Sequence, residues 1–177
     1  MELVFASANE HKVSEIRSIA GSAILLKSLN DIACFDEIPE TGDTFEENSG
    51  QKSRYIFDRY HCDCFADDSG LEIDALNGEP GVNSAHYSGS RDFEQNMQLV
   101  LDRLEGQKNR TARFRTVISL IMRGKEYLFE GSIEGKISLQ RSGSQGFGYD
   151  PIFHPDGYEI SFAEMDPAEK NRISHRA

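Results

Sequence analysis

Two adjacent carboxylates, Asp67 and Asp68, stand between a short apolar run and an alternating apolar one within residues 65–73. We expect a strand that ends at these acids, where a Ser-Gly turn follows. Carboxylates in that position can hold a hard divalent cation or accept a proton from water. Successive side chains of a strand point to opposite faces, so only one of the two can face a given ligand. We assign Asp68 as metal ligand and general base, and Asp67 to local hydrogen bonds. The alternative is a turn that Asp68 caps with its own side chain.

A second candidate is the polar segment Ser7, Ala8, Asn9, Glu10, His11 and Lys12, which joins an expected strand to an expected helix. Free backbone N–H groups and the positive end of the helix dipole favour an anion there. Asn9 would add an amide, and Lys12 a point charge for phosphate oxygens. The alternative is a capped helix with a solvated lysine.

Further candidates lie in two loops and near the end of the chain. Glu40 stands in a loop fixed by proline and glycine, which makes it the best second acid. The segment Phe147, Gly148, Tyr149 and Asp150 places two aromatic rings beside glycines, and the stacking of a base on an exposed ring contributes about 1–3 kcal/mol. The alternative is a turn that fills the core. Three polar donors, Lys170, His175 and Arg176, fall on or just after one helix, although a solvated helix face explains Lys170 equally well.

The composition limits the class of protein. The chain has 177 residues, 38% of them hydrophobic, which is enough for one domain with a core. A net charge of −11, from 30 acidic against 19 basic residues, argues against a nucleic acid or an anionic membrane as partner. The chain has three cysteines, an odd number that does not suggest a framework of paired disulfides. Neither a signal peptide nor a membrane span is visible. We therefore expect a cytoplasmic protein.

Hydrophobic periodicity and capping residues predict alternating strands and helices. We expect strands at residues 2–6, 23–26 and 112–122, and a hairpin strand at 127–129. Helices are expected after Asn9, from Thr44 with its capping-box partner Glu47, and from residue 93 to a stop at Gly106. Residues 81–90 should form a loop, and Asp166 followed by Pro167 should cap a terminal helix.

Taken together, the motifs resemble the inosine triphosphate pyrophosphatase family. They are the segment at 7–12, PETG with TFEEN at 39–48, ADDSGL at 66–71, FGYDP at 147–151 and EK followed by SHR at 169–176. The resemblance implies one α/β domain over residues 1–177, with two lobes on a long twisted mixed β-sheet, flanking helices and an active-site cleft between the lobes. It also implies a homodimer and Mg²⁺-dependent hydrolysis of ITP, dITP and XTP to the monophosphate and pyrophosphate.

Carried over by position, the resemblance gives each candidate a role. Residues 7–12 and Lys52 would bind the phosphates, and Asp68 would be the catalytic residue. Glu40 and Asp68 would bind magnesium, and Ser69 would touch the nucleotide. The base would be surrounded by Phe147, Gly148, Tyr149, Asp150, Lys170, His175 and Arg176. Buried hydrogen-bond donors on His175 and Arg176 would favour a 6-oxo purine, whose oxygen accepts, over adenine, whose amine donates. An unmade buried hydrogen bond costs about 1–3 kcal/mol.

The chain departs from the family pattern in two places. Where members often have PG-x-YSARY, this chain has Asn83 and His86 in residues 80–87. Relatives also continue past SHR into a closing helix, so we expect an exposed apolar surface near Arg176. Two other functions are compatible with the motifs. One is a nucleotide-binding sensor or scaffold without turnover, and the other is a septum-formation-like nucleotide pyrophosphatase, which FGYDP and SHR disfavour.

Overall fold

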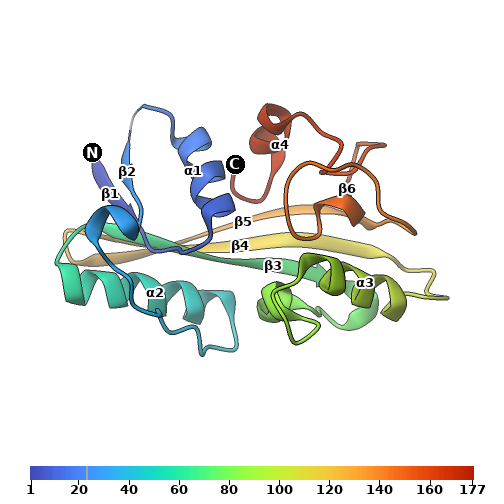
Figure 1. Cartoon of the computed structure of the whole chain (residues 1–177), viewed down its shortest axis with the longest axis horizontal. Coiled ribbons are helices and arrows are strands. Elements are labelled where there is room, and N and C mark those ends of the chain that lie inside the picture. The colour runs from blue at the N-terminus through green and yellow to red at the C-terminus, as the bar shows by residue number, and fades with distance from the viewer. Residues whose placement is uncertain (23) are drawn as a thin grey trace. The chain divides into compact units, whose positions relative to one another are not determined.

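The computed structural model describes residues 1–22 and 24–177 as a mixed β-sheet with flanking helices (Figure 1). In this part of the chain the sheet has six strands in the order β2-β1-β3-β4-β5-β6. Strand β1 runs parallel to β2 and β3, and β6 runs antiparallel to β5. The strands are β1 (Glu2–Phe5), β2 (Leu25–Lys27), β3 (Cys64–Ile73), β4 (Thr111–Met122), β5 (Lys125–Ile137) and β6 (Phe153–Pro155). The helices are α1 (Glu10–Ala20), α2 (Phe45–Tyr60), α3 (Phe93–Arg103) and α4 (Pro167–Ile173). The predicted α/β fold is confirmed.

The chain divides into two compact units. Unit 1 comprises Met1–Asp68 and Thr116–Glu130, and unit 2 comprises Ser69–Arg115 and Gly131–Ala177. Strands β3, β4 and β5 each pass from one unit into the other along the chain. The boundary in β3 falls at the peptide bond between Asp68 and Ser69.

Strand β1 is buried on both faces from Leu3 to Phe5, which explains why these three residues are all apolar. Leu3 and Phe5 share a core cluster with Val13 and Ile16 of α1. Val4 and Ala6 point the other way, into a cluster that includes Ile56 of α2. Figure 1 shows α1 and α2 on opposite faces of β1 and β3. Both helices therefore present their first turns close to the middle of β3.

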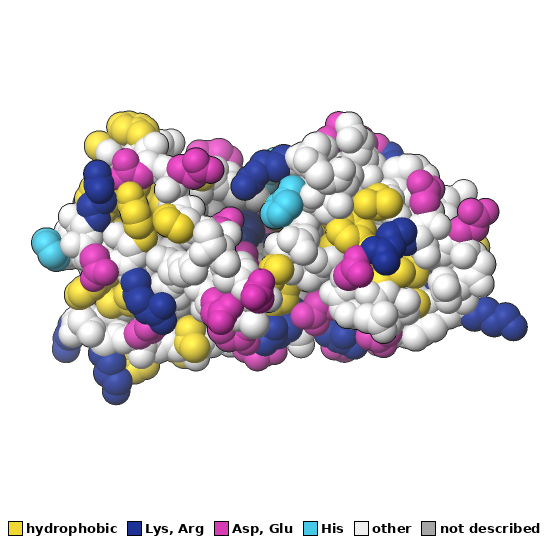
Figure 2. Space-filling model, turned by 90° about the horizontal axis from the view of Figure 1, so that it is seen from below, with side chains coloured by type: hydrophobic (Ala, Val, Ile, Leu, Met, Phe, Trp, Pro, Cys, Tyr) yellow, Lys and Arg dark blue, Asp and Glu magenta, His cyan; other side chains and the backbone are white. Residues whose placement is uncertain are grey.

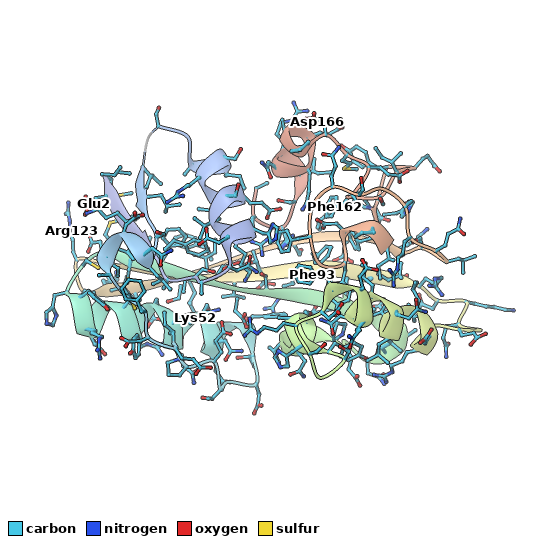
Figure 3. The ribbon with its side chains drawn as sticks, viewed as in Figure 1. Glu2, Lys52, Phe93, Arg123, Phe162 and Asp166 are labelled. Atoms are coloured by element: carbon cyan, nitrogen blue, oxygen red, sulfur yellow. The ribbon has the colours of Figure 1, made fainter. Side chains whose placement is uncertain are left out.

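The core of unit 2 is a cluster built mainly on α3 and the aromatic residues of the C-terminal segments. Met97 and Val100 of α3, and Leu104 directly after it, are buried with Phe114 of β4. Phe162, labelled in Figure 3, belongs to the same cluster, and its ring lies 5.2 Å from that of Phe153. This core holds in place the segment that carries Phe147 to Asp150.

The predicted helix starts are confirmed by their caps. The side chains of Asn9, Thr44 and Asp166 each accept a hydrogen bond from a backbone N–H in the first turn that follows. Each signal is local in sequence, because a cap needs only the residue before the helix and the N–H groups two or three positions on.

Other expectations need correction. Strand β2 begins at Leu25, and Ala23 lies outside the described residues. Strand β5 extends to Ile137, well beyond the predicted 127–129. Residues 81–90, expected to form a loop, contain a short 3-10 helix at Gly81–His86.

The expectation that a strand ends at the two acids is also wrong. Strand β3 continues through Asp67, Asp68, Ser69 and Gly70, so the Ser-Gly pair makes no turn and Asp68 caps none. Gly70 serves packing instead, because a Cβ atom there would lie 2.2 Å from the carbonyl oxygen of Gly81. Only glycine permits this close approach of two backbone segments.

Three further properties complete the description. Across residues 1–22 and 24–177, no helix combines the length and apolarity needed to cross a bilayer. Lys and Arg side chains are interspersed with Asp and Glu on the face seen in Figure 2, and apolar atoms form small separate patches. Cys34, Cys62 and Cys64 are free thiols, and burial raises the pKa of Cys64 to about 12.

Candidate functional site

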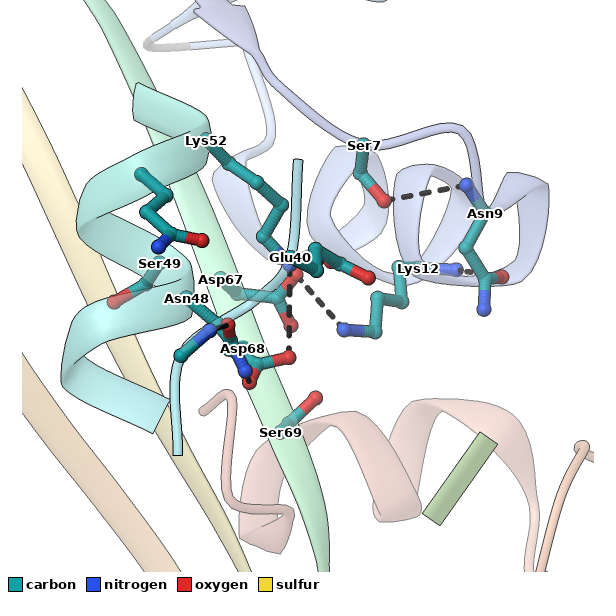
Figure 4. Close-up of polar contacts among 12 residues, drawn as sticks. Ser7, Asn9, Lys12, Glu40, Asn48, Ser49, Lys52, Asp67, Asp68 and Ser69 are labelled. Atoms are coloured by element: carbon teal, nitrogen blue, oxygen red, sulfur yellow. Dashed lines mark hydrogen bonds and ion pairs between the residues drawn. The ribbon is translucent and has the colours of Figure 1, made fainter. Parts of the chain in front are cut away.

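Asp67 and Asp68 are successive residues of β3, and their carboxylates have different nearest partners. The Asp67 side chain is fully buried and forms an ion pair with Lys12 of α1 at 3.1 Å. The carboxylate of Asp68 accepts a hydrogen bond from Asn48 of α2 at 3.0 Å (Figure 4). Strand β3 therefore connects the first turns of two helices through two neighbouring carboxylates.

Lys52 joins Asp68 to the second predicted acid. Its ammonium nitrogen contacts Glu40 and lies 3.5 Å from Oδ1 of Asp68. The Lys52 side chain is 7% exposed, whereas that of Glu40 is 42% exposed. We call Lys12, Glu40, Lys52, Asp67 and Asp68 the carboxylate cluster.

The electrostatics of this cluster suit proton transfer. Burial raises the pKa of Asp68, and the charges of Lys52 and Lys12 offset part of that rise. Burial alone would lower the pKa of Lys52, but the nearby carboxylates, Asp68 foremost, raise it. Lys52 thus remains a cation beside a carboxylate whose proton affinity is above that of an ordinary aspartate, which favours Asp68 as a general base.

The segment 7–12 forms a helix N-terminus beside this cluster. Asn9 caps α1, with its side-chain oxygen accepting from the N–H groups of His11 and Lys12 at 3.0 and 3.2 Å. The hydroxyl of Ser7 accepts from the N–H of Asn9 at 3.2 Å. Ala8, Glu10 and His11 are exposed. The helix is capped, as the alternative expected, but Lys12 is not a solvated lysine, because its side chain is 14% exposed and pairs with Asp67 in the carboxylate cluster.

In unit 2 the predicted residues gather around Lys170. Its ammonium donates to Asp150 at 2.7 Å, and both side chains are nearly inaccessible, at 7% and 5% exposed. The ammonium also lies over the rings of Phe147 and Phe162, at 5.2 and 5.5 Å. Asp150 accepts the backbone N–H of Phe147 at 2.8 Å, which fixes the loop that carries this ring.

Arg176 and His175 follow α4 and are both buried. Arg176 donates to the hydroxyl of Ser69 at 2.6 Å, and its guanidinium lies 6.0 Å from the ring of Phe147. The imidazole of His175 stacks on Phe114 at 5.1 Å. We call Ser69, Phe147, Asp150, Lys170 and Arg176 the Lys170 cluster.

One predicted aromatic face is not exposed. Tyr149 is 4% exposed, and its hydroxyl donates to the carbonyl oxygen of Ser84 at 2.8 Å. Its ring fills the core of unit 2, so the core-filling alternative is correct for Tyr149. Phe147 is half-buried and keeps part of its surface accessible, while Gly148 beside it has a φ of 63°, a left-handed conformation that favours glycine.

Asn48 is a residue that the sequence patterns did not single out. It stands four residues before Lys52 on α2, so both side chains lie on the same face of the helix. The cap at Thr44, whose side chain accepts the N–H of Glu47, fixes where the helix begins. That signal could have placed Asn48 beside Lys52, but not beside Asp68.

The described residues contain no group of three His, Cys, Asp or Glu side chains arranged to hold a metal ion by themselves. Magnesium in phosphate-transferring sites is commonly bound by one or two carboxylates together with substrate phosphates and water. The oxygen donors of Glu40 and Asp68, joined through Lys52, fit that smaller set.

Comparison with known proteins gives a consistent result. A sequence profile described as the Ham1 family matches residues 3–177. The dITP/XTP pyrophosphatase of Flavobacterium johnsoniae is 50% identical over 177 residues, covering 99% of this chain and 92% of that protein. The dITP/XTP pyrophosphatase of Porphyromonas gingivalis is 46% identical over 178 residues, with 99% and 92% covered.

Solved structures agree in fold. The Staphylococcus aureus Ham1 protein matches with a TM-score of 0.89 at 36% identity, over 99% of this chain and 92% of that one. A nucleoside-triphosphatase, also named dITP/XTP pyrophosphatase, from Mycobacterium abscessus matches with a TM-score of 0.81 at 40% identity, over 99% and 95%. The resemblance suggested by the sequence motifs is therefore confirmed, and the chain belongs to the Ham1 family.

Proposed function

We propose that this protein hydrolyses the non-canonical purine nucleoside triphosphates ITP, dITP and XTP to the monophosphate and pyrophosphate. Relatives named for dITP and XTP hydrolysis, at up to 50% identity over 177 residues, support the reaction class. The observation that carries the proposal is the carboxylate of Asp68, whose pKa is raised by burial and which lies 3.5 Å from the ammonium of the buried Lys52. Lys52 also contacts Glu40, so two carboxylates and a cation are gathered at one point of unit 1. The proposal assigns the phosphate contacts to the carboxylate cluster and the base contacts to the Lys170 cluster, within one domain over residues 1–177.

Glu40 and Asp68 would hold Mg²⁺ in this proposal. When bound, the ion supplies charge neutralisation and polarisation of phosphate oxygens. Its two protein ligands come from a loop and from β3, and α2 contacts both through Lys52. The protein therefore fixes the spacing of the carboxylates through one helix.

The residues of unit 1 account for the chemistry at the phosphates. Lys12, Lys52 and the positive N-terminal end of α1 in the segment 7–12 bind phosphate oxygens and neutralise the charge that builds on departing pyrophosphate. Asp68 orients a water molecule and accepts its proton as the water attacks the α-phosphorus in line with the leaving group. Asp67 holds Lys12 through its buried ion pair.

The residues of unit 2 account for the choice of base. The accessible ring surface of Phe147 provides a stacking platform. Lys170, His175 and Arg176 supply donors suited to the oxygen of a 6-oxo purine, where adenine presents an amine. Gly148 would give the base close access to the backbone. Asp150, expected to lie around the base, positions Lys170 in this proposal, and Tyr149 supports this loop from the core.

The selectivity argument predicts a specific variant effect. Arg176→Ala should lower the ratio of kcat/KM for ITP to that for ATP by about 10-fold or more, because one buried donor to the 6-oxo group is lost. Arg172→Ala is the matched control, because it removes the same charge from an exposed position on α4. An unchanged ratio in Arg176→Ala would refute this account of selectivity. Steady-state kinetics with both triphosphates provides the measurement.

The reaction itself is tested by measuring pyrophosphate release from ITP, XTP, ATP and modified pyrimidine triphosphates, with and without Mg²⁺. The proposal predicts rapid release from ITP and XTP that depends on Mg²⁺. Tight ITP binding without turnover would indicate a nucleotide sensor instead. A preference for the modified pyrimidines would indicate the septum-formation-like activity.

The proposal also includes a cytoplasmic homodimer. It acts on free nucleotides and has neither nucleic acid nor membrane as a partner. The net charge of −11 supports a small-molecule partner over nucleic acid. Three consecutive apolar side chains of β5 are exposed, Tyr127 at 40%, Leu128 at 54% and Phe129 at 55%, and such a run favours burial against a second copy. Sedimentation velocity should show a dimer that Phe129→Lys dissociates, whereas Leu139→Lys, at a separate exposed position, should leave it intact. A monomeric wild type would contradict the homodimer.

A further inference from the structure

The buried side-chain amide of Asn48 makes two hydrogen bonds, one as donor and one as acceptor. Its nitrogen donates to Oδ2 of Asp68 at 3.0 Å, and its oxygen accepts the backbone N–H of Gly42 at 2.8 Å. The side chain is 5% exposed, so both bonds are shielded from water. The orientation of the amide is fixed chemically, because the Gly42 N–H only donates and an ionised carboxylate only accepts. Rotating the amide by half a turn would break both bonds at once.

The two partners of Asn48 lie on different segments of unit 1. Gly42 lies in residues 40–43, which we call the Glu40 loop, and Asp68 lies on β3. Glycine is required at position 42, because a Cβ atom there would lie 2.5 Å from Cβ of Glu47 and 3.0 Å from Oδ1 of Asn48. The loop therefore approaches α2 as closely as backbone atoms allow.

Gln51 and Glu47 of α2 also hold the Glu40 loop. Within the described residues, neither makes a hydrogen bond to Asp68. Gln51 makes two hydrogen bonds to Thr41, accepting its N–H at 2.9 Å and donating to its hydroxyl at 3.1 Å. Glu47 accepts the N–H of Asp43 at 2.8 Å. Asn48 is distinguished from both by its second bond, to the carboxylate.

Asn48 and Lys52 divide the two oxygens of Asp68 between them. The amide of Asn48 is bonded to Oδ2, and the ammonium of Lys52 lies 3.5 Å from Oδ1 (Figure 4). A carboxylate held at both oxygens keeps one rotamer, because rotation about its side-chain bonds would break one of the two contacts. The same two α2 residues also contact the Glu40 loop, at Gly42 and at Glu40.

We infer that Asn48 is a positioning residue, which holds the carboxylate of Asp68 in its reactive orientation and in register with the Glu40 loop. The inference rests on the proposed function for its kinetic consequence and on the two hydrogen bonds for its geometry. Partners of this kind, behind groups that contact a substrate or metal, commonly contribute about 10- to 100-fold to activity.

Two variants separate this role from simple anchoring of the loop. Asn48→Asp keeps the shape and an oxygen acceptor for Gly42, but it replaces the donor to Asp68 by a second oxygen. Gln51→Ala removes two hydrogen bonds to the loop and leaves the contact with Asp68 in place. Anchoring alone predicts that Gln51→Ala is the more damaging change, whereas positioning of Asp68 predicts the reverse.

Steady-state kinetics with ITP at saturating Mg²⁺ gives the first readout. Asn48→Asp should lower kcat about 10- to 100-fold, with KM changing less than about threefold because the phosphate and base contacts come from other residues. Gln51→Ala should change kcat less than about threefold. Wild-type kcat in Asn48→Asp, or an equal loss in both variants, would overturn the inference.

Crystal structures of the two variants give a readout that does not require turnover. In Asn48→Asp the Asp68 side chain should leave its present rotamer while the Glu40 loop stays in place, and in Gln51→Ala the Asp68 rotamer should be unchanged. An unmoved Asp68 in Asn48→Asp would overturn the inference. If the wild type hydrolyses no triphosphate, the proposed function fails, and this comparison still decides the role of Asn48.

Discussion

Replacing Asp68 by asparagine is expected to lower kcat for ITP by about 10²- to 10⁴-fold, the range found when a positioned general base is removed. The amide of asparagine has nearly the same shape as the carboxylate, but it cannot accept a proton from water. It also loses the charge that lies 3.5 Å from Lys52 and that would bind the metal ion. Pyrophosphate release under single-turnover conditions measures the chemical step directly.

Asp58→Asn is the matched control for this variant, because it makes the same chemical change at an exposed position of α2. Circular dichroism should show that both proteins are folded. Retention of more than about a tenth of wild-type kcat by Asp68→Asn would assign the general base to another group.

Lys170→Met is expected to destabilise the protein by about 3–5 kcal/mol, because it leaves the carboxylate of Asp150 buried without its cation. The two groups are 2.7 Å apart, and both are almost fully buried. Equilibrium unfolding in urea measures the free energy of unfolding. Base selectivity should fall as well, because Lys170 is one of the proposed donors to the 6-oxo group.

The double variant Lys170→Met with Asp150→Asn should recover part of that stability, because the buried charge is then removed. Lys108→Met, at an exposed position in unit 2, should change the free energy of unfolding by less than about 0.5 kcal/mol. A loss below about 1 kcal/mol in Lys170→Met would show that the pair contributes little, as exposed ion pairs do.

The sequence predicted the features that depend on neighbouring residues. Asn9, Thr44 and Asp166 cap helices because each cap involves only the few residues that follow it. The alternation of β4 likewise follows from the side-chain period of a strand. Family motifs then predicted the site residues as one set, because the resemblance assigns a role to each position.

The features that the sequence did not predict depend on contacts between distant residues. A Ser-Gly pair usually favours a turn, but Gly70 continues β3 because the backbone of Gly81 packs against it. Tyr149 is flanked by glycine and looked exposed, yet the carbonyl of Ser84 accepts its hydroxyl inside the core. Asn48 donates a hydrogen bond to the carboxylate of Asp68, twenty positions further along the chain. The spacing of residues within α2 does not predict a contact with a residue on another element.

The central claim is that water attacks the α-phosphorus of a bound purine triphosphate beside Asp68. Hydrolysis of ITP in water labelled with oxygen-18, followed by mass spectrometry of both products, tests this claim directly. The account predicts that the label enters inosine monophosphate and that the released pyrophosphate carries none. Label in pyrophosphate, or formation of inosine diphosphate, would place the attack at another phosphorus and contradict the account.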